Sequence, residues 1–282
     1  MSPHTTTPTV DLPIHRIAPA IGWVPVRLGE IWEYRELLYF LVWREIKVRY
    51  KQTVLGVAWA VMQPFFTMVV FTIFFGKLAR MPTDGIPYPV SVYCALLPWQ
   101  LFAFSLTESS NSVVANQRLL TKVYFPRLIM PIAAVSVGLA DSAISFVVLL
   151  LIMAYYGIAP GMAALTVPVW ALFAVAAAIG VGLWLSALNV RYRDIRYTLP
   201  FLTQIWLFVT PVVYPSSMVP AAWRPFYALN PMVGVVDGFR WALVGGPSPQ
   251  ATIGVSALVV LILLTSGLFY FRRTERTFAD IV

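Results

Sequence analysis

The chain has 282 residues, of which 59% are hydrophobic and only 11% are charged, whereas about a quarter of the residues in a soluble domain are charged. Polar side chains are too few to cover a soluble globule, so the composition predicts a protein embedded in lipid. The net charge of +8 would indicate nucleic-acid binding in a soluble protein, but these cations lie between apolar runs, where they set topology and meet lipid headgroups. The single cysteine, Cys94, excludes an intrachain disulfide bond and a cysteine metal cluster.

The N-terminal part of the chain is predicted to lie in the cytosol. Residues 1–27 are rich in proline and threonine and lack the apolar core of a signal peptide, so we expect a flexible cytosolic tail. Residues 28–53 can place apolar side chains on one side and charges on another, which predicts an amphipathic helix on the cytoplasmic leaflet. A simple start-transfer anchor explains the same pattern. This segment ends in four cations that keep it in the cytoplasm, Arg44, Lys47, Arg49 and Lys51.

Six apolar segments predict six transmembrane helices within residues 54–271, because each comes close to the roughly 20 residues that a span needs. They lie near residues 54–76, 89–113, 129–156, 165–188, 197–214 and 251–271, and the fifth is the shortest. With both termini inside, 16 of the 20 Lys and Arg residues fall on the cytoplasmic side. This positive-inside bias predicts an all-α, multi-pass membrane protein with a cytosolic tail over 272–282.

Residues 215–250, between the last two spans, predict a re-entrant helical hairpin on the outer side of the membrane. Asn230 followed by Pro231 is a typical helix start, and the run Gly245-Gly246-Pro247 is a typical stop. The helix between them has about 14 residues and a length of roughly 21 Å, too short to cross a hydrocarbon core of about 30 Å. A shorter helix is expected before it, over about 217–228.

Two sets of side chains are candidates for lining and gating a translocation path that such a hairpin would close. Aromatic rings near the first and fifth spans predict a channel wall that holds sugar rings by their apolar faces, namely Phe66, Phe71, Phe74, Phe75, Trp206, Phe208 and Tyr214. Lipid-facing rings explain any one of these residues better than the channel does. We assign Asn230, Asp237 and Arg240 to an outer gate, although the last two, three residues apart, also fit a simple ion pair.

The chain lacks the residues that membrane enzymes and ATPases need. It contains no G-x-x-x-x-G-K-[ST] phosphate-binding loop, so we expect it to bind no cofactor and not to hydrolyse ATP. Its two histidines, His4 and His15, both lie in the predicted tail. No catalytic or metal-binding set is evident in the spans, and an embedded glycan enzyme is therefore poorly supported.

Asp141 is the one acidic residue near the middle of a predicted span. A charge at that depth costs about 2.5–3.5 kcal/mol on insertion scales. No Lys or Arg lies at matching depth in any predicted span, so we expect a neutral, hydrogen-bonded side chain, with Ser142 and Ser145 nearby in sequence. A proton relay in an ion-coupled carrier is the alternative.

Five stretches resemble, in order, the permease subunits of polysaccharide ABC exporters, the type-two exporters of O-antigen, capsule and teichoic acid. They are VRYKQTVLGVAWAVMQP, NQRLLTKVYFPRLIMPIAAV, LNVRYRDIRYTLPF, TPVVYP and NPMVGVVDGFR, and the resemblance covers about residues 28–275. It implies a bacterial inner-membrane half-transporter, in which two copies of this chain form a polymer channel and two copies of a separate ATPase bind ATP and Mg²⁺.

The resemblance also implies roles for two cytoplasmic sets of residues. The loop over 116–127 is implied to dock on the ATPase through Asn116, Arg118, Lys122 and Arg127. The substrate is implied to be a glycan on undecaprenyl pyrophosphate or a related lipid. Arg44, Lys47, Arg49 and Lys51 could meet its pyrophosphate, or could only fix the orientation of the chain.

Overall fold

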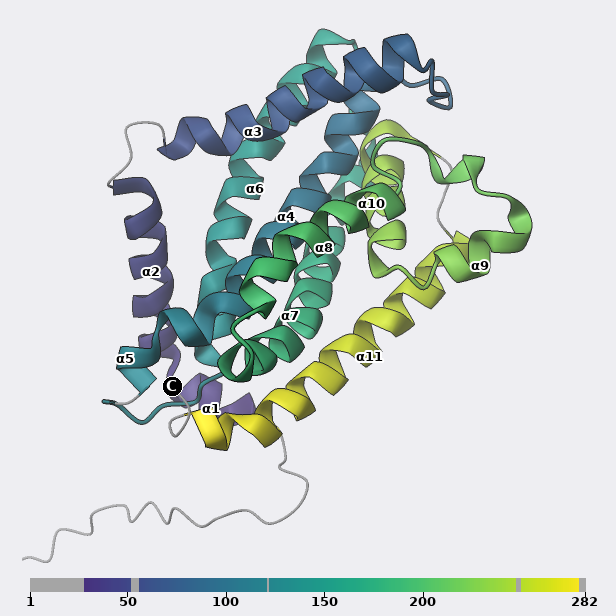
Figure 1. Ribbon diagram of the computed structural model, residues 1–282. Coiled ribbons are helices and arrows are strands. Elements are labelled where there is room, and N and C mark those ends of the chain that lie inside the picture. Colours follow the sequence, from purple (N-terminus) through teal and green to yellow (C-terminus); the bar gives the residue numbers. More distant parts are fainter. Residues whose placement is uncertain (1–27, 52–55, 121, 247–249, 279–282) are drawn as a thin grey trace, which may run out of the picture.

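The computed structural model describes residues 28–51, 56–120, 122–246 and 250–278, and in these ranges every regular element is a helix. The predicted tail over 1–27 lies outside them. Figure 1 shows a bundle with α1 (Leu28–Glu33) and α5 (Gln117–Leu120) at the end where α11 (Gln250–Thr274) finishes, and α9 (Arg224–Tyr227) at the opposite end.

Five helices of the described chain are long and apolar enough to cross a membrane. They contain α3 (Gly56–Phe71) with its π-helical continuation Thr72–Leu78, α4 (Tyr88–Ala115), α6 (Ile129–Tyr155), α7 (Val167–Arg191) and α11. These correspond to the first, second, third, fourth and sixth predicted spans. The chain is therefore a multi-pass membrane protein.

The predicted fifth span over 197–214 is shorter than expected. Helix α8 (Ile195–Val209) has 15 residues, which is roughly 22 Å and less than a hydrocarbon core of about 30 Å. It ends because Thr210 precedes Pro211, and a residue before proline is driven to extended backbone; Thr210 has φ −98° and ψ 145°. Six full spans are thus not confirmed.

The predicted helix over 28–53 is two helices, α1 and α2 (Arg35–Lys51), with a turn at Tyr34 between them. Its last two residues lie outside the described ranges. Helix α2 packs along α6, yet among its residues only Leu41 is buried, and large apolar side chains such as Tyr39, Phe40 and Val48 stay exposed. A clean division into an apolar and a charged face is therefore not confirmed.

The core of the bundle forms around α4, which packs against α3, α6, α7, α8 and α10 (Pro231–Val244). Helices α7 and α11 approach each other through glycines. A Cβ atom built on Gly267 would lie 2.3 Å from the carbonyl oxygen of Gly180. Small residues let helix backbones come into direct contact in membranes, so no larger side chain fits at this crossing.

Residues 272–278, which were predicted to begin a cytosolic tail, are part of the packed structure. Helix α11 continues to Thr274, and the ring of Phe278 packs edge-on against Phe271 at 5.3 Å between centroids. Arg272, 7% exposed, pairs with Glu30 of α1 at 2.9 Å and with Glu275 at 2.7 Å. These contacts join the first and last described helices.

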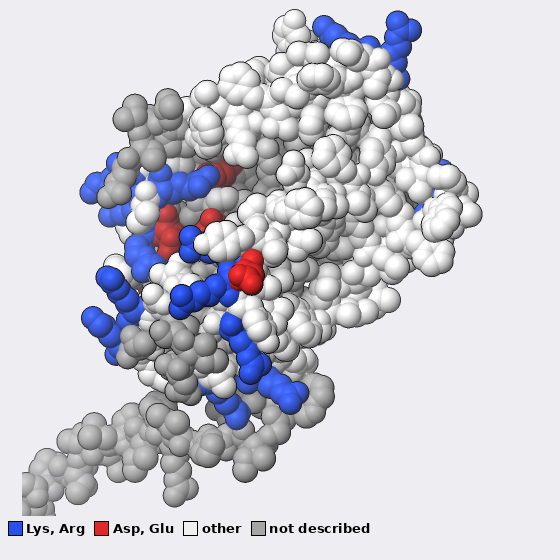
Figure 2. All heavy atoms as spheres, in the orientation of Figure 1, with Lys and Arg blue, Asp and Glu red and all other residues white. Residues whose placement is uncertain are grey.

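Lysine and arginine side chains gather at one end of the molecule, around α1, α2 and α5, and a smaller group lies at the far end (Figure 2). Apolar surface separates the two. This is the distribution that the positive-inside rule predicts for a protein whose α1 end faces the cytoplasm.

A labelling experiment tests that orientation. A cysteine replacing the exposed residue Asp84, before α4, should react with an impermeant thiol reagent added to intact cells, and one replacing Arg193, between α7 and α8, should not. Native Cys94 is fully buried and should remain unlabelled, which provides the background. Labelling at Arg193 from outside would reverse the orientation.

Candidate functional site

Asp141 has a cationic partner, contrary to the expectation from the spans. Its Oδ2 lies 2.5 Å from Nη2 of Arg49, and its Oδ1 accepts a hydrogen bond of 2.5 Å from the Tyr50 hydroxyl. Both partners belong to α2, which precedes the first span and packs along α6, so a search confined to the spans could not find them. Burial, and then the hydrogen bond to Asp141, raise the pKa of Tyr50 above its usual range, which keeps its hydroxyl a donor.

A polar cavity of about 380 Å³ adjoins this ion pair. Side chains from α2, α3, α4, α6 and α8 line it. The polar ones are Arg49, Gln63, Thr67, Gln100, Thr107, Glu108, Asp141, Ser142, Ser145 and Thr203. Figure 2 looks onto a recess beside α2 where acidic and basic atoms lie next to one another. Gln63 lies in the first of the five stretches that resemble the exporter permeases, whereas Gln100 lies in none of them, and its place inside an apolar run was its only sequence signal.

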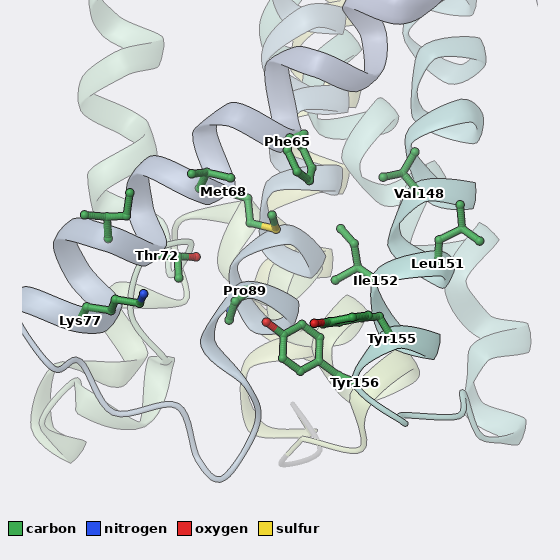
Figure 3. A pocket seen from close by; sticks show the side chains of 12 residues that line it. Phe65, Met68, Thr72, Lys77, Pro89, Val148, Leu151, Ile152, Tyr155 and Tyr156 are labelled. Atoms are coloured by element: carbon green, nitrogen blue, oxygen red, sulfur yellow. The ribbon is translucent and has the colours of Figure 1, made fainter.

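A second, mostly apolar cavity of about 570 Å³ lies between the C-terminal half of α3 with its π-helical continuation and the C-terminal half of α6. Figure 3 shows Met68 and Thr72 on one side and Ile152 on the other, with the rings of Tyr155 and Tyr156 at one end. The two rings meet edge to face at 5.2 Å. Such a lining suits lipid chains or aromatic groups and offers few hydrogen bonds.

The predicted channel aromatics do not lie in one place. Phe66, Phe74 and Phe208 are exposed, whereas Phe71 and Phe75 are half-buried and pack edge to face at 5.6 Å.

Trp206 packs its ring 5.0 Å from that of Phe102 and donates a 3.0 Å hydrogen bond from Nε1 to Asn230. The Tyr214 hydroxyl donates to the carbonyl oxygen of Phe208. Trp206 and Tyr214 therefore have structural partners, and the exposed rings are the ones available to a ligand, a lipid or a second copy.

The four cations in the C-terminal half of α2 have different surroundings. Arg44 pairs with Glu45 and donates a 2.6 Å hydrogen bond to Oδ1 of Asn116 at the end of α4. Arg49 is held by Asp141. Lys47 is exposed and lies 5.0 Å from the ring centroid of Trp43, and Lys51 is also exposed. A pyrophosphate would therefore meet the two lysines more readily than the two arginines.

The predicted ATPase-docking loop forms a small surface at the end of the bundle where α1 lies (Figure 1). Helix α5 is a single turn, and the chain from Leu120 to Arg127 encloses a pocket of about 230 Å³. Arg118 and Lys122 are exposed, as is the ring of Tyr124 at 78%. The guanidinium of Arg127 lies over the Phe278 ring at 5.8 Å. Aromatic and arginine side chains are enriched in protein interfaces.

The predicted start and stop of α10 are confirmed. Asn230 is its N-cap and accepts a 3.1 Å hydrogen bond from the backbone nitrogen of Met232, Pro231 is the first helical residue, and Gly245 ends the helix with φ 70°. In place of the predicted helix over about 217–228 there are two 3-10 turns and the one-turn helix α9.

Arg240 fastens the segment after α8 to α10. It is 7% exposed and donates to the carbonyl oxygens of Val212 at 3.0 Å, Tyr214 at 3.3 Å and Ser91 at 3.4 Å. Asp237 lies 4.0 Å away, so the expected pair is present. The three carbonyl contacts join residues far apart in sequence and had no local signal.

The sequence of this chain is similar to a known family and to several known proteins. A family model described as ABC-2 type transporter matches residues 36–244. An O-antigen export system permease protein RfbA of Myxococcus xanthus is 32% identical over 87% of this chain and 96% of its own length. Another RfbA, of Klebsiella pneumoniae, is 27% identical over 88% and 95%, and the polysialic acid transport protein KpsM of Escherichia coli is 26% identical over 82% and 91%. The chain belongs to the ABC-2 type transporter family.

Proposed function

We propose that this chain is the transmembrane subunit of an ATP-driven exporter that moves a lipid-linked polysaccharide, of the O-antigen kind, across the bacterial inner membrane. The observation that carries the proposal is the 32% identity to an O-antigen export permease over 96% of that protein's length. A capsular polysaccharide is the second candidate substrate, because a polysialic acid transport protein is also similar over most of the chain. A teichoic acid is a third.

The energy for transport comes from a separate ABC ATPase in this proposal. The sequence has no phosphate-binding loop of its own, so ATP and Mg²⁺ belong to the partner. The docking surface is the segment from α5 to Arg127, where Lys122 and Tyr124 are exposed. An ion-coupled carrier working without an ATPase finds no support in Asp141, because its carboxylate is paired with Arg49.

Two copies of the chain form the path. A hydrated glycan is wide and polar, and a channel between two copies keeps backbone groups away from lipid. We place α3 and α8 on the channel wall and the segment containing α9 and α10 at the outer exit as a re-entrant element, with Lys47 and Lys51 toward the pyrophosphate of the lipid carrier.

Deletion of the gene tests the proposal. Cells that lack the chain should keep making the lipid-linked polysaccharide but should retain it inside, and the wild-type chain should restore surface polymer. The measurement is the distribution of labelled polysaccharide between the cell surface and the inner leaflet. An unchanged amount of surface polysaccharide in the deletion strain would contradict the proposed function.

Charge reversal tests the docking surface. Lys122→Glu should lower the amount of ATPase that copurifies with the permease by about tenfold, because one lost contact worth about 1.4 kcal/mol changes an equilibrium by that factor. Arg193→Glu changes an exposed cation in the cytoplasmic loop between α7 and α8 and is the matched control. Equal copurification of ATPase with the two variants would place the docking surface elsewhere.

A further inference from the structure

The polar cavity beside α2 lies at a depth where lipid surrounds an ordinary span. Gln63, Gln100 and Asp141 belong to the middle parts of α3, α4 and α6, and all three line it. A primary amide in an apolar medium costs free energy unless its donors and acceptors find partners. Two such amides in one cavity therefore need an explanation.

The amides have no partner in the described part of the chain. Neither Gln63 nor Gln100 makes a side-chain hydrogen bond there, and the Glu108 carboxylate accepts none. Other polar groups of the same cavity do find partners: the Ser145 hydroxyl donates to the carbonyl oxygen of Ala60, and the Thr203 hydroxyl to that of Leu199. Gln63 and Glu108 are exposed and Gln100 is half-buried, so the two amides and the carboxylate are accessible to a ligand.

The charges of the cavity disfavour an anionic ligand. Arg49 carries its one positive charge, and this is already paired with Asp141 while the guanidinium lies 4.8 Å from the ring centroid of Phe104. Glu108 adds a second formal negative charge. A phosphate or pyrophosphate would meet an excess of acid, whereas a neutral group with hydroxyls would not.

The remaining chemistry fits a sugar. An amide both donates and accepts hydrogen bonds, and a carboxylate accepts them. A sugar hydroxyl also both donates and accepts, so it can bond to either group. The rings of Trp99 and Phe104 add apolar surface to the lining, against which C–H faces can pack. A volume of about 380 Å³ falls within the roughly 300–1,000 Å³ of small-ligand sites.

We propose that this cavity is a saccharide-binding site that holds a short neutral segment of the glycan during its passage. Gln63, Gln100 and Glu108 bind sugar hydroxyls, and the Arg49–Asp141 pair fixes one wall. The inference rests on the proposed function and deepens it. Gln63 lies on α3 and Thr203 on α8, the two helices assigned to the channel wall, so the cavity adds hydrogen-bonding groups to that wall.

Photocrosslinking in living cells tests the site. A photoreactive amino acid replaces Gln63, Gln100 or Thr203, one at a time, in the full chain expressed with its ATPase in the strain that makes the polysaccharide. The cells are fed ¹⁴C-glucose to label sugars or ³²P-phosphate to label lipids, then irradiated, and the permease is purified under denaturing conditions. Leu172, exposed on α7, is the matched control position.

We expect sugar label on the permease at the cavity positions, several-fold above that at Leu172, and its loss when glycan synthesis is blocked. Gln100→Leu should slow export several-fold without lowering the amount of permease in the membrane, and Leu172→Ala should not slow it. Sugar label no higher than at Leu172, or ³²P label that persists without glycan synthesis, would overturn the site, the latter in favour of a lipid. The gene deletion described above tests separately whether the chain is needed for export, so a failure of the binding site can be told apart from a failure of the proposed function.

Discussion

Replacing Gly267 with valine should destabilise the folded protein by about 3 kcal/mol or more, since overpacking of a tight core costs about 1–3 kcal/mol and occasionally more. The Cβ atom alone would lie 2.3 Å from the Gly180 carbonyl oxygen, which belongs to rigid helix backbone. Helices α7 and α11 must then separate, and the contacts on either side of the crossing are lost with them. The measurement is the thermal unfolding of the purified permease in detergent, together with its yield.

Gly254→Val is the matched control for this experiment. Gly254 lies on the same helix, and a Cβ atom there meets nothing within 4 Å in the described structure. The two variants therefore carry the same change of helix propensity but differ in packing. Equal unfolding temperatures for both would mean that α7 and α11 do not cross at Gly180 and Gly267.

Asp141→Ala should lower the free energy of unfolding by about 2 kcal/mol. Breaking a fully buried ion pair costs about 3–5 kcal/mol, because the remaining charge is left unpaired. The Arg49 and Asp141 side chains are 33% and 16% exposed, so solvent reduces the cost. Arg49→Ala should cost a similar amount, and the double variant less than the sum of the two. The stability of Asp141→Asn should lie between those of the wild type and Asp141→Ala, because the amide oxygen still accepts one of the two hydrogen bonds that Arg49 and Tyr50 donate, but the side chain carries no charge.

Thermal unfolding of the wild type, the two alanine variants and the double variant measures the coupling energy between Arg49 and Asp141. Lys47→Ala, an exposed cation on the same helix, is the control and should change little. Strictly additive effects of Arg49→Ala and Asp141→Ala would mean that the two residues do not form a pair in the membrane. Export measured in the same variants then tells whether the pair serves transport as well as stability.

The spans and α10 could be predicted because their signals are local. Five apolar runs near the required length gave helices where they were expected, and only their ends shifted by a few residues. Helix α10 starts at Asn230 and Pro231 and stops at Gly245, since capping and a left-handed glycine depend on neighbours in sequence. The predicted fifth span failed at Thr210, although the signal against it, the following proline, was also local.

Sequence by itself determined that this protein is a bundle of apolar helices with its cations mainly at one end, because length, hydropathy and charge act through the solvent and need no partner. Tertiary structure alone decided which polar groups meet. Arg49 reaches Asp141 across 92 positions of sequence, and Arg240 reaches Ser91 across 149. The cavity around Gln63, Gln100 and Glu108 takes its lining from five helices. Contacts of this kind depend on how the helices cross. The crossings are set by close packing between helices, such as the backbone contact of Gly180 with Gly267, which no periodicity along the chain records.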